Sequence, residues 1–509
     1  MKVRFTTLGC KLNFAESSAL GKELLSRGHQ RASLNEEPDV CVVNTCSVTD
    51  AADHKDRQTI NQLHRKYPNA IIIVTGCYAQ LQPEQIAQIP GVDYVLGQNE
   101  KYDIPALVDT LESQLLHHST PPPHHTTPPP HHTTQLPHHA TPPPHNATPP
   151  LHHTTPHIHV CAIREVEEFH GVHSGDDRTR CFIKVQDGCN YFCTYCTIPY
   201  ARGKSRNPKI EEVVRTAQQA IDQGAKELIL TGVNIGDFGR TTGERFIDLL
   251  RALDNLSPLA CGVPEKSIDF WGASSPLACG VPEKSTDFWG ASSPFACGVP
   301  EKSIDFWGAS SPLASTYRIR ISSCEPNLLT DEVIDFVANS KHFAPHFHIP
   351  LQSGSNEVLQ IMKRRYTREL FAERVQHIKS VMPHAFIGVD CMVGVRGETQ
   401  EYWEDYLAFV RSLDVSQLHV FTYSERANTR MLEMDLYVVP KSERQRRSKI
   451  LHEVSEQKTR DFYAKHANRP ALVLWESKRE GDQMSGFTDN YIKVYRPYDK
   501  TKINTFELV

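Results

Sequence analysis

The chain has 509 residues, enough for about three domains of ordinary size, so a single small binding module is excluded. Hydrophobic residues make up 39% and charged residues 23%, which is the range of a globular protein and excludes a wholly disordered or fibrous chain. The net charge of -5 argues against a uniformly basic nucleic-acid binder, although a local basic stripe can still attract RNA. The N-terminal segment has no apolar signal region and no apolar run approaches a membrane span. We therefore expect a cytoplasmic protein that makes no membrane contact.

The first region, residues 1–115, alternates apolar runs with polar or amphipathic ones. These runs predict strands at 3–8, 40–44, 70–75 and 92–96 and helices at 15–27, 50–67 and 105–116. Strands that alternate with helices favour a parallel sheet with helices on its faces. We expect an α/β domain here.

Two segments interrupt the pattern and cannot build a core. Residues 116–159 are rich in His, Pro and Thr, which favours an extended surface insert over a specific metal site. A linker at 160–177 is expected to follow it. Residues 257–314 hold three near-identical copies of an 18-residue unit. A solenoid is the alternative, but near-identity and shared Pro and Gly breakers favour a tandem expansion of a surface loop.

Residues 178–440 again alternate strands and helices once the repeat is set aside. The apolar runs predict six strands, at 182–186, 227–231, 317–321, 347–351, 386–392 and 417–421. Six such units fit a partial or complete TIM-like α/β barrel, in which the loops after the strands carry the chemistry. A basic connecting helix at 441–468 then leads to residues 469–509, whose short apolar-polar runs predict a small β-domain.

Cys189, Cys193 and Cys196 follow the first of these six strands at the spacing C-x3-C-x2-C. Three thiolates on one tight loop can hold three irons of a 4Fe-4S cluster and leave the fourth iron open for a non-protein ligand. Zinc with a fourth ligand from elsewhere is the alternative metal, and three cysteines buried as small hydrophobes is the other interpretation. The strand-end position and the aromatic Tyr195 favour the cluster.

A second set of cysteines lies in the first region. Cys10, Cys46 and Cys77 each come just after a predicted strand, whereas Cys41 lies inside one and is expected in the core. Because the ends of parallel strands lie side by side, the first three thiols can converge on one point. Each precedes a predicted helix whose N-terminal amides can stabilise sulfur charge. Ordinary buried cysteines would account for one or two such positions, so three predict a second 4Fe-4S cluster.

The segment DGCNYFCTYC resembles the radical S-adenosylmethionine superfamily, in which the open iron chelates that cofactor. With TLGCKLN, NTCSVT, TGCYAQ, RIRISS, HIPLQSGSN, LHVFTYS and GFTDNYIKV, nearly all the non-insert sequence resembles the methylthiotransferase family, and within it the MtaB-type enzymes of tRNA. The resemblance implies an N-terminal cluster domain, a radical SAM barrel and a C-terminal TRAM-like RNA-binding domain. Because the sequence stops at FELV, the same resemblance leads us to expect a truncated final domain that lacks its last strand.

The resemblance also implies the reaction. The substrate would be N6-threonylcarbamoyladenosine at position 37, beside the tRNA anticodon, and the product its 2-methylthio derivative. One S-adenosylmethionine would methylate sulfur at the first cluster, and a second would be cleaved to a radical at the other. An electron donor and a sulfur source of unknown identity are implied. The alternatives are a methylthiotransferase for isopentenyladenosine in tRNA or for a ribosomal-protein aspartate, and an inactive RNA-binding protein that keeps its clusters.

The same resemblance points to cofactor-binding residues, each of which could equally serve a turn or the core, whereas charge and aromatic chemistry point to the RNA contacts. For cofactor binding the resemblance points to Tyr195, Gly232, Asn234, Ser322, Ser323, Gln352, Val393 and Gly394. For RNA contact, where basic groups meet phosphates and aromatic rings stack on unpaired bases, the candidates are Lys363, Arg364, Arg365, Tyr491, Lys493, Tyr495 and Arg496. The alternative for each basic group is a solvated helix face.

Two departures from the family pattern concern loops. Val395 and Arg396 stand where Phe-Pro is usual, so we expect a flexible, charged turn beside the cofactor pocket. Asn428 stands where Gly is usual, which can strain its loop.

Overall fold

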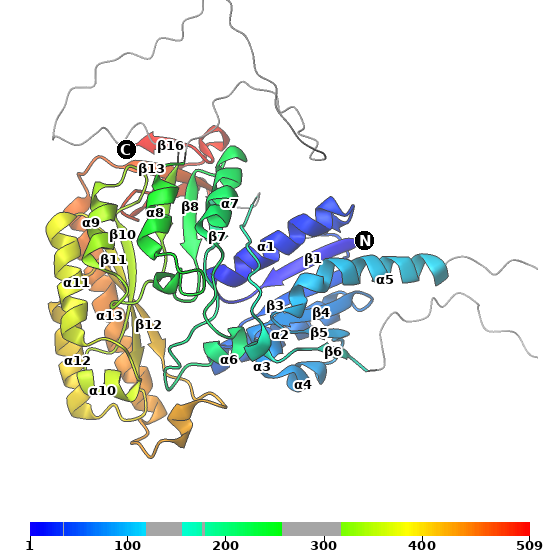
Figure 1. The fold of residues 1–509 in the computed structure, drawn as a ribbon, viewed down its shortest axis with the longest axis horizontal. Helices are drawn as coiled ribbons and strands as arrows, with labels where there is room; N and C mark the ends of the chain where they lie inside the picture. The colour runs from blue at the N-terminus through cyan, green and yellow to red at the C-terminus, as the bar shows by residue number, and fades with distance from the viewer. Residues whose placement is uncertain (34, 119–154, 176–178, 257–316) are drawn as a thin grey trace, which may run out of the picture.

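The computed structural model describes residues 1–33, 35–118, 155–175, 179–256 and 317–509 (Figure 1). Most of the two expected inserts, residues 119–154 and 257–314, therefore lies outside the described residues. Within the described ranges, no helix is both long and apolar enough to cross a membrane.

The N-terminal region forms one parallel sheet of order β2-β1-β3-β4-β5-β6, as the alternating pattern predicts. The central strands β3 and β4 are buried along their whole length, and Cys41 lies in this core as expected. The elements are β1 (Lys2–Thr7), α1 (Lys11–Ser26), β2 (Gln30–Arg31), β3 (Val40–Thr45), α2 (Asp50–Lys66), β4 (Ile71–Gly76), α3 (Cys77–Leu81), α4 (Pro83–Ala87), β5 (Tyr94–Leu96), α5 (Ile104–His118) and β6 (His157–His159).

The expected boundaries of the first insert and the linker need correction. Strand β6 belongs to residues assigned to the insert, because His157, Ile158 and His159 pair with β5 and extend the sheet. The described part of the expected linker is also ordered. The amide of Ser174 donates to the carbonyl of Phe182 at 2.9 Å, so this segment pairs with β7. Both segments are therefore edge partners of a sheet.

The described part of the second region contains six parallel strands that follow one another in chain order. Sheets β7-β8-β9 and β10-β11-β12 are joined by two isolated parallel bridges, Ile319 to Phe343 and Ser323 to His348. The strands are β7 (Arg180–Lys184), β8 (Glu227–Thr231), β9 (Arg318–Ile321), β10 (His346–Gln352), β11 (Phe386–Val393) and β12 (Gln417–Thr422). The helices are α6 (Ile198–Arg202), α7 (Ile210–Asp222), α8 (Phe246–Asp254), α9 (Asp331–Asn339), α10 (Asn356–Ile361), α11 (Arg368–Val381), α12 (Gln400–Ser412) and α13 (Lys441–His466).

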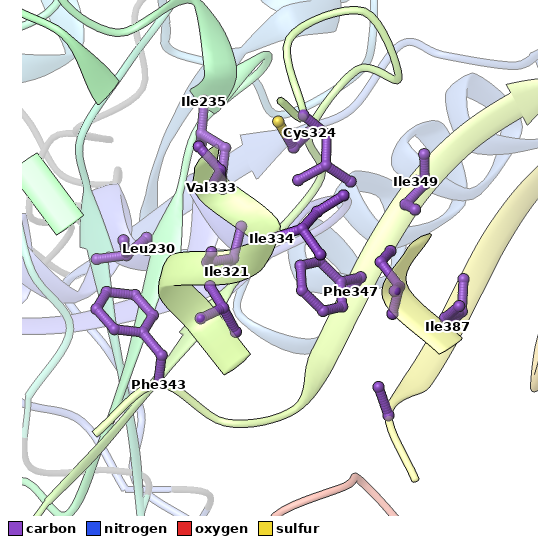
Figure 2. Packing of buried hydrophobic residues seen from close by; sticks show 14 of the residues in the cluster. Leu230, Ile235, Ile321, Cys324, Val333, Ile334, Phe343, Phe347, Ile349 and Ile387 are labelled. Carbon is purple, nitrogen blue, oxygen red and sulfur yellow. The ribbon is translucent and has the colours of Figure 1, made fainter. Parts of the chain in front are cut away.

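The largest hydrophobic core lies between these strands and their covering helices. Figure 2 shows Val333 and Ile334 of α9 beside Ile321 of β9 and Phe347 of β10, all buried. Removing such surfaces from water contributes about 25 cal/mol per Å² of apolar area. This packing fixes the strands, and with them the loops that follow their carboxyl ends.

The C-terminal residues form a small antiparallel sheet of order β15-β14-β13-β16, which lies above the second region in Figure 1. Its strands are β13 (Leu472–Glu480), β14 (Gln483–Phe487), β15 (Lys493–Pro497) and β16 (Phe506–Leu508). Arg320 of β9 donates to the carbonyls of Thr488 and Asp489, each at 2.7 Å. Arg318 donates to the carbonyl of Phe487 at 2.9 Å. The two guanidinium groups thus attach the small sheet to the second region.

Candidate functional site

Cys10, Cys46 and Cys77, the sheet-edge cysteines, converge as the strand pattern predicts. Cys10 is the N-cap of α1, Cys46 follows β3, and Cys77 is the first residue of α3. Burial, and then the neighbouring Cys77 and Cys10, raise the pKa of Cys46 to about 12. The helix that follows Cys46, α2, begins at Asp50, as the sequence predicts.

Two glycines make this convergence possible. Gly9 and Gly76 precede Cys10 and Cys77 and have φ of +93° and +99°. A Cβ on Gly9 would lie 2.6 Å from Cβ of Cys46, and one on Gly76 would lie 2.4 Å from the carbonyl oxygen of Thr45. Both positions therefore need a residue that has no side chain and tolerates positive φ.

Polar groups surround the sheet-edge thiols. The side-chain amide of Gln98 donates to Sγ of Cys77 at 3.2 Å. The backbone amide of Cys46 donates to Oδ2 of Asp56 at 2.9 Å, and burial raises the pKa of Asp56 to about 7. Sequence reasoning missed both partners, which lie on other elements than the cysteines they contact.

A buried ion-pair network connects the two regions next to these thiols. Arg202 of α6 lies 3.1 Å from a carboxylate oxygen of both Glu16 and Asp187. Lys184 of β7 lies 3.2 Å from Glu16, and Lys101 lies 2.6 Å from it. These five side chains are at most 3% exposed. Since a buried charge that loses its partner is costly, the network fixes α1 against the second region.

Cys189, Cys193 and Cys196, the loop cysteines, lie on the loop between β7 and α6. The backbone amide of Tyr191 donates to Sγ of Cys189 at 3.4 Å, and the amide of Cys196 donates to the carbonyl of Cys193 at 3.0 Å. Burial raises the pKa of Cys189 to about 12 and also raises that of Cys193 and Cys196. Metal binding at either set must therefore displace thiol protons.

Arg364 does not lie on an RNA-accessible surface, which corrects the expectation from sequence. Its side chain is 4% exposed and forms an ion pair with Glu325. It donates to Sγ of Cys193 at 3.3 Å and to the hydroxyl of Tyr366 at 3.0 Å. The guanidinium group is therefore part of the surroundings of the loop cysteines.

One cavity of about 870 Å³ is lined by all three sheet-edge cysteines and by Cys196 of the loop cysteines, whereas Cys189 and Cys193 do not line it. Residues from the N-terminal sheet, from the loop after β7 and from the carboxyl ends of several strands of the second region line it. The expected site residues among them are Cys10, Cys46, Cys77, Tyr195, Cys196, Gly232, Ser322, Ser323 and Gln352. Such a cavity is large enough for a small molecule together with part of a second one.

The remaining expected cofactor residues do not line this cavity. Asn234 and Val393 are buried, and Gly394 adopts φ of +77° with its amide donating to Glu398 at 3.0 Å. Gln352, which does line it, is a non-glycine residue with φ of +63°. Such strained backbone is common at functional sites.

The cavity also contains polar residues that sequence reasoning missed. Lys11, His348 and Asp390 line it, on α1, β10 and β11. Nε2 of His348 lies 2.7 Å from Asp390, and Nδ1 of His419 lies 3.3 Å from the same oxygen. Burial opposes ionisation of Asp390, yet His348 and His419 hold its pKa below the ordinary value. A titratable residue inside a mostly apolar strand, His348 in HIPLQ and Asp390 in FIGVD, was the signal that could have found this pair.

The other expected RNA residues form no single surface. Lys363 is exposed, and so is Arg365, which lies over the ring of Tyr191 at 4.1 Å. Tyr495 is 51% exposed. By contrast, Lys493 pairs with Glu480, Arg496 pairs with Glu507, and Tyr491 stacks on Phe487 against the second region.

The two loop departures have different outcomes. Asn428 adopts φ of +64°, the strained conformation expected where glycine is usual. The turn at Val395 and Arg396 is not loose, because Val395 is fully buried and Arg396 lies 2.9 Å from Glu425. Packing and one ion pair thus replace the rigidity expected of proline.

Comparisons with known proteins show which family the sequence belongs to. Two family models match: Uncharacterized protein family UPF0004 over residues 2–97, and Radical SAM superfamily over residues 183–269 and 301–410. The threonylcarbamoyladenosine tRNA methylthiotransferase MtaB of Bacillus subtilis is 31% identical over 97% of this chain and 89% of that protein. MtaB of Aquifex aeolicus is 29% identical over 97% of each. A tRNA-2-methylthio-N(6)-dimethylallyladenosine synthase of Pelotomaculum thermopropionicum is 28% identical over 85% of this chain and 77% of that protein. The chain therefore belongs to the MtaB-type methylthiotransferases of the radical SAM superfamily.

Proposed function

We propose that this enzyme converts N6-threonylcarbamoyladenosine beside the tRNA anticodon to its 2-methylthio derivative. The observation that carries the proposal is the cavity that is lined by all three sheet-edge cysteines and by Cys196 of the loop cysteines. A methylthio group delivered at one set can reach a base activated at the other only if the two share one chamber. Radical SAM and MtaB-type membership agrees with this chemistry.

The two cysteine sets fit two 4Fe-4S clusters. Each offers three converging thiols, which leaves the fourth iron of a cluster open to a non-protein ligand. When bound, the clusters and S-adenosylmethionine supply the sulfur, the methyl group and the one-electron chemistry that substitution at an unactivated C2–H requires.

The chain's own residues then bind and orient the reactants. Ser322, Ser323 and Gln352 present hydrogen-bonding groups at the strand ends beside Tyr195, where S-adenosylmethionine would lie. Gly232 carries no side chain, and a Cβ there would lie 2.9 Å from the carbonyl oxygen of Gln186. Close packing against Gln186 therefore requires a residue without a side chain at this point of the cavity wall.

We further propose that the six strands act as a partial radical SAM barrel and that the C-terminal sheet is a TRAM-like RNA-binding domain. Exposed Lys363, Arg365 and Tyr495 are the candidates for contact with phosphates and bases of the anticodon arm. An electron donor and a sulfur source complete the reaction, which we expect in the cytoplasm, where tRNA is modified.

Nucleoside mass spectrometry of tRNA tests the proposal. Cells without the protein should accumulate N6-threonylcarbamoyladenosine, and expression of the wild-type chain should restore the 2-methylthio nucleoside. The Cys46→Ala and Cys193→Ala variants should not restore it. A change confined to dimethylallyladenosine, or to an aspartate of a ribosomal protein, would contradict the assigned substrate. No change in any of these three targets would indicate an inactive RNA-binding protein.

A further inference from the structure

We propose that Lys11 binds the carboxylate of the threonylcarbamoyl group and so selects this substrate. The inference rests on the proposed function and assigns a specificity residue within the same cavity.

Lys11 extends from the N-terminal region into the cavity. It is the first residue of α1, directly after Cys10, and it lines the cavity with His348 and Asp390. The charges that act on its ammonium include Asp390 of β11, Arg320 of β9 and Arg180 of β7. Lys11 is exposed, and it lines the same open cavity as Asp390 and the ends of these strands.

The charge of Lys11 is available to a ligand. Arg202 also lines the cavity, but its guanidinium group is paired with Glu16 and Asp187. His348 is paired with Asp390. Among the described residues, neither Lys11 nor Lys55, the other lysine of the lining, lies within ion-pair distance of a carboxylate. Lys55 is exposed on α2 and serves as a natural control.

The position of Lys11 matches the shape of the proposed substrate. Consecutive Cα atoms are about 3.8 Å apart, so Lys11 starts one residue from the proposed cluster ligand Cys10. C2 of the adenine must reach that cluster to receive the methylthio group. C6, which carries the threonylcarbamoyl group on N6, is separated from C2 by the single ring atom N1. The substituent of a correctly placed base therefore lies within reach of one long side chain.

A lysine in this place favours a substituent that carries negative charge. Threonylcarbamoyl ends in a carboxylate, whereas dimethylallyl is an uncharged hydrocarbon that would leave the ammonium desolvated without a counterion. A charge-assisted hydrogen bond in a partly buried site is worth roughly a 10- to 100-fold difference in binding. The expected discrimination is of that size.

The test combines a change in the protein with a change in the substrate. Lys11→Met, Lys11→Arg and the control Lys55→Met are loaded with both clusters. Each is assayed with an anticodon stem-loop RNA carrying N6-threonylcarbamoyladenosine and with the same RNA whose threonyl carboxylate is a primary amide. Wild type should show a KM roughly 10- to 100-fold higher for the amide. Lys11→Met should show the higher KM for both RNAs and no preference between them. Lys11→Arg should recover part of the preference, and Lys55→Met should keep all of it.

Other outcomes overturn the inference in distinguishable ways. If wild type modifies neither RNA, the proposed function fails. If wild type and Lys11→Met prefer the carboxylate RNA over the amide RNA to the same extent, a different group binds the carboxylate. S-adenosylmethionine also carries a carboxylate, so its binding and its cleavage without RNA are measured in parallel. Loss of that binding in Lys11→Met, with the RNA preference intact, would assign the lysine to the cofactor.

Discussion

The two cysteine sets of this enzyme are built in opposite ways. The sheet-edge cysteines come from three separate strand ends and meet because Gly9 and Gly76 allow close backbone approach. The loop cysteines come from one short loop, and Arg364 reaches them from a segment far along the chain. The first set thus depends on the fold of a whole sheet, whereas the second depends on one loop and one buried cation.

The electrostatic surroundings differ as well. Asp56, with its raised pKa, contacts the backbone of Cys46, whereas a guanidinium group donates directly to Sγ of Cys193. Hydrogen bonds to sulfur raise the reduction potential of an iron–sulfur cluster. A site that must pass an electron to S-adenosylmethionine and a site that must hold transferable sulfur are expected to be tuned separately.

The largest expected effect is that each cysteine set supports a different step of the reaction. Replacing Cys189, Cys193 and Cys196 by Ala should leave about four irons per chain and abolish cleavage of S-adenosylmethionine. Replacing Cys10, Cys46 and Cys77 should also leave about four irons but preserve cleavage, with no methylthio product. Iron analysis, deoxyadenosine release and nucleoside mass spectrometry measure the three quantities. Full iron content in either triple variant would disprove the ligand assignment.

A glycine substitution should disable the sheet-edge set alone. Gly9→Ala places a Cβ 2.6 Å from Cβ of Cys46, so we expect loss of that cluster and of product while the loop cluster remains. Gly28→Ala is the matched control, since Gly28 has φ of +92° but no atom within 4 Å of the added Cβ. Both substitutions place alanine at a positive φ, which destabilises the two variants similarly. The variants therefore differ only in the packing around the added Cβ. Equal cluster loading in the two would refute the packing argument.

Arg364 should affect only the loop set. Removing its hydrogen bond to Cys193 in Arg364→Gln should lower the reduction potential of that cluster by roughly 60 mV, for a bond worth about 1.4 kcal/mol. Potentiometric titration followed by electron paramagnetic resonance measures the shift. Because Glu325 would be left unpaired, the double variant with Glu325→Gln separates the potential from folding. Arg365→Gln changes an exposed neighbour and should leave the potential unchanged.

The smallest expected effect concerns the stability of the apoprotein near the sheet-edge set. The carboxyl of Asp56 has its pKa raised from 3.8 to about 7, so the unfolded chain ionises it first and stability falls as pH rises from about 4 to about 7. Asp56→Asn removes this loss. The free energy of unfolding of this variant should exceed that of wild type by an amount that grows between about pH 4 and about pH 7. The difference should reach at most about 4 kcal/mol above pH 7. Urea unfolding at several pH values measures it, and a pH-independent difference would contradict the assignment.

Sequence patterns predict features that depend on neighbours along the chain. The strands β3 and β4 and the helix α13 lie close to their expected positions, because long apolar or helical runs define them. The sheet-edge cysteines meet because the ends of parallel strands lie side by side, and the loop cysteines are together because they are close in sequence. The expected start of the first helix at residue 15 missed the first turn of α1, residues 11–14, in which Leu12 and Asn13 are already buried.

Features that depend on distant partners could not be predicted. The run Lys363 to Arg365 suggested an RNA contact, yet the middle residue is buried against Glu325 and Cys193. A run of charge carries no information about which of its members has a buried counterion. Likewise, Lys11, His348 and Asp390 come from three elements, and only the packed chain brings them to one cavity.

The hydroxyl of Tyr317 lies 3.0 Å from the carbonyl oxygen of Leu256 and 3.2 Å from that of Leu253. These contacts hold Tyr317, the residue before β9, next to the end of α8. The 18-residue repeat lies between these two points of the chain. With both ends held by the folded domain, the copy number of the repeat can change without moving β9. Each doubling of a closed loop adds only about 0.6 kcal/mol of entropic cost. Variants with one, two or four copies of the repeat should therefore fold and react alike.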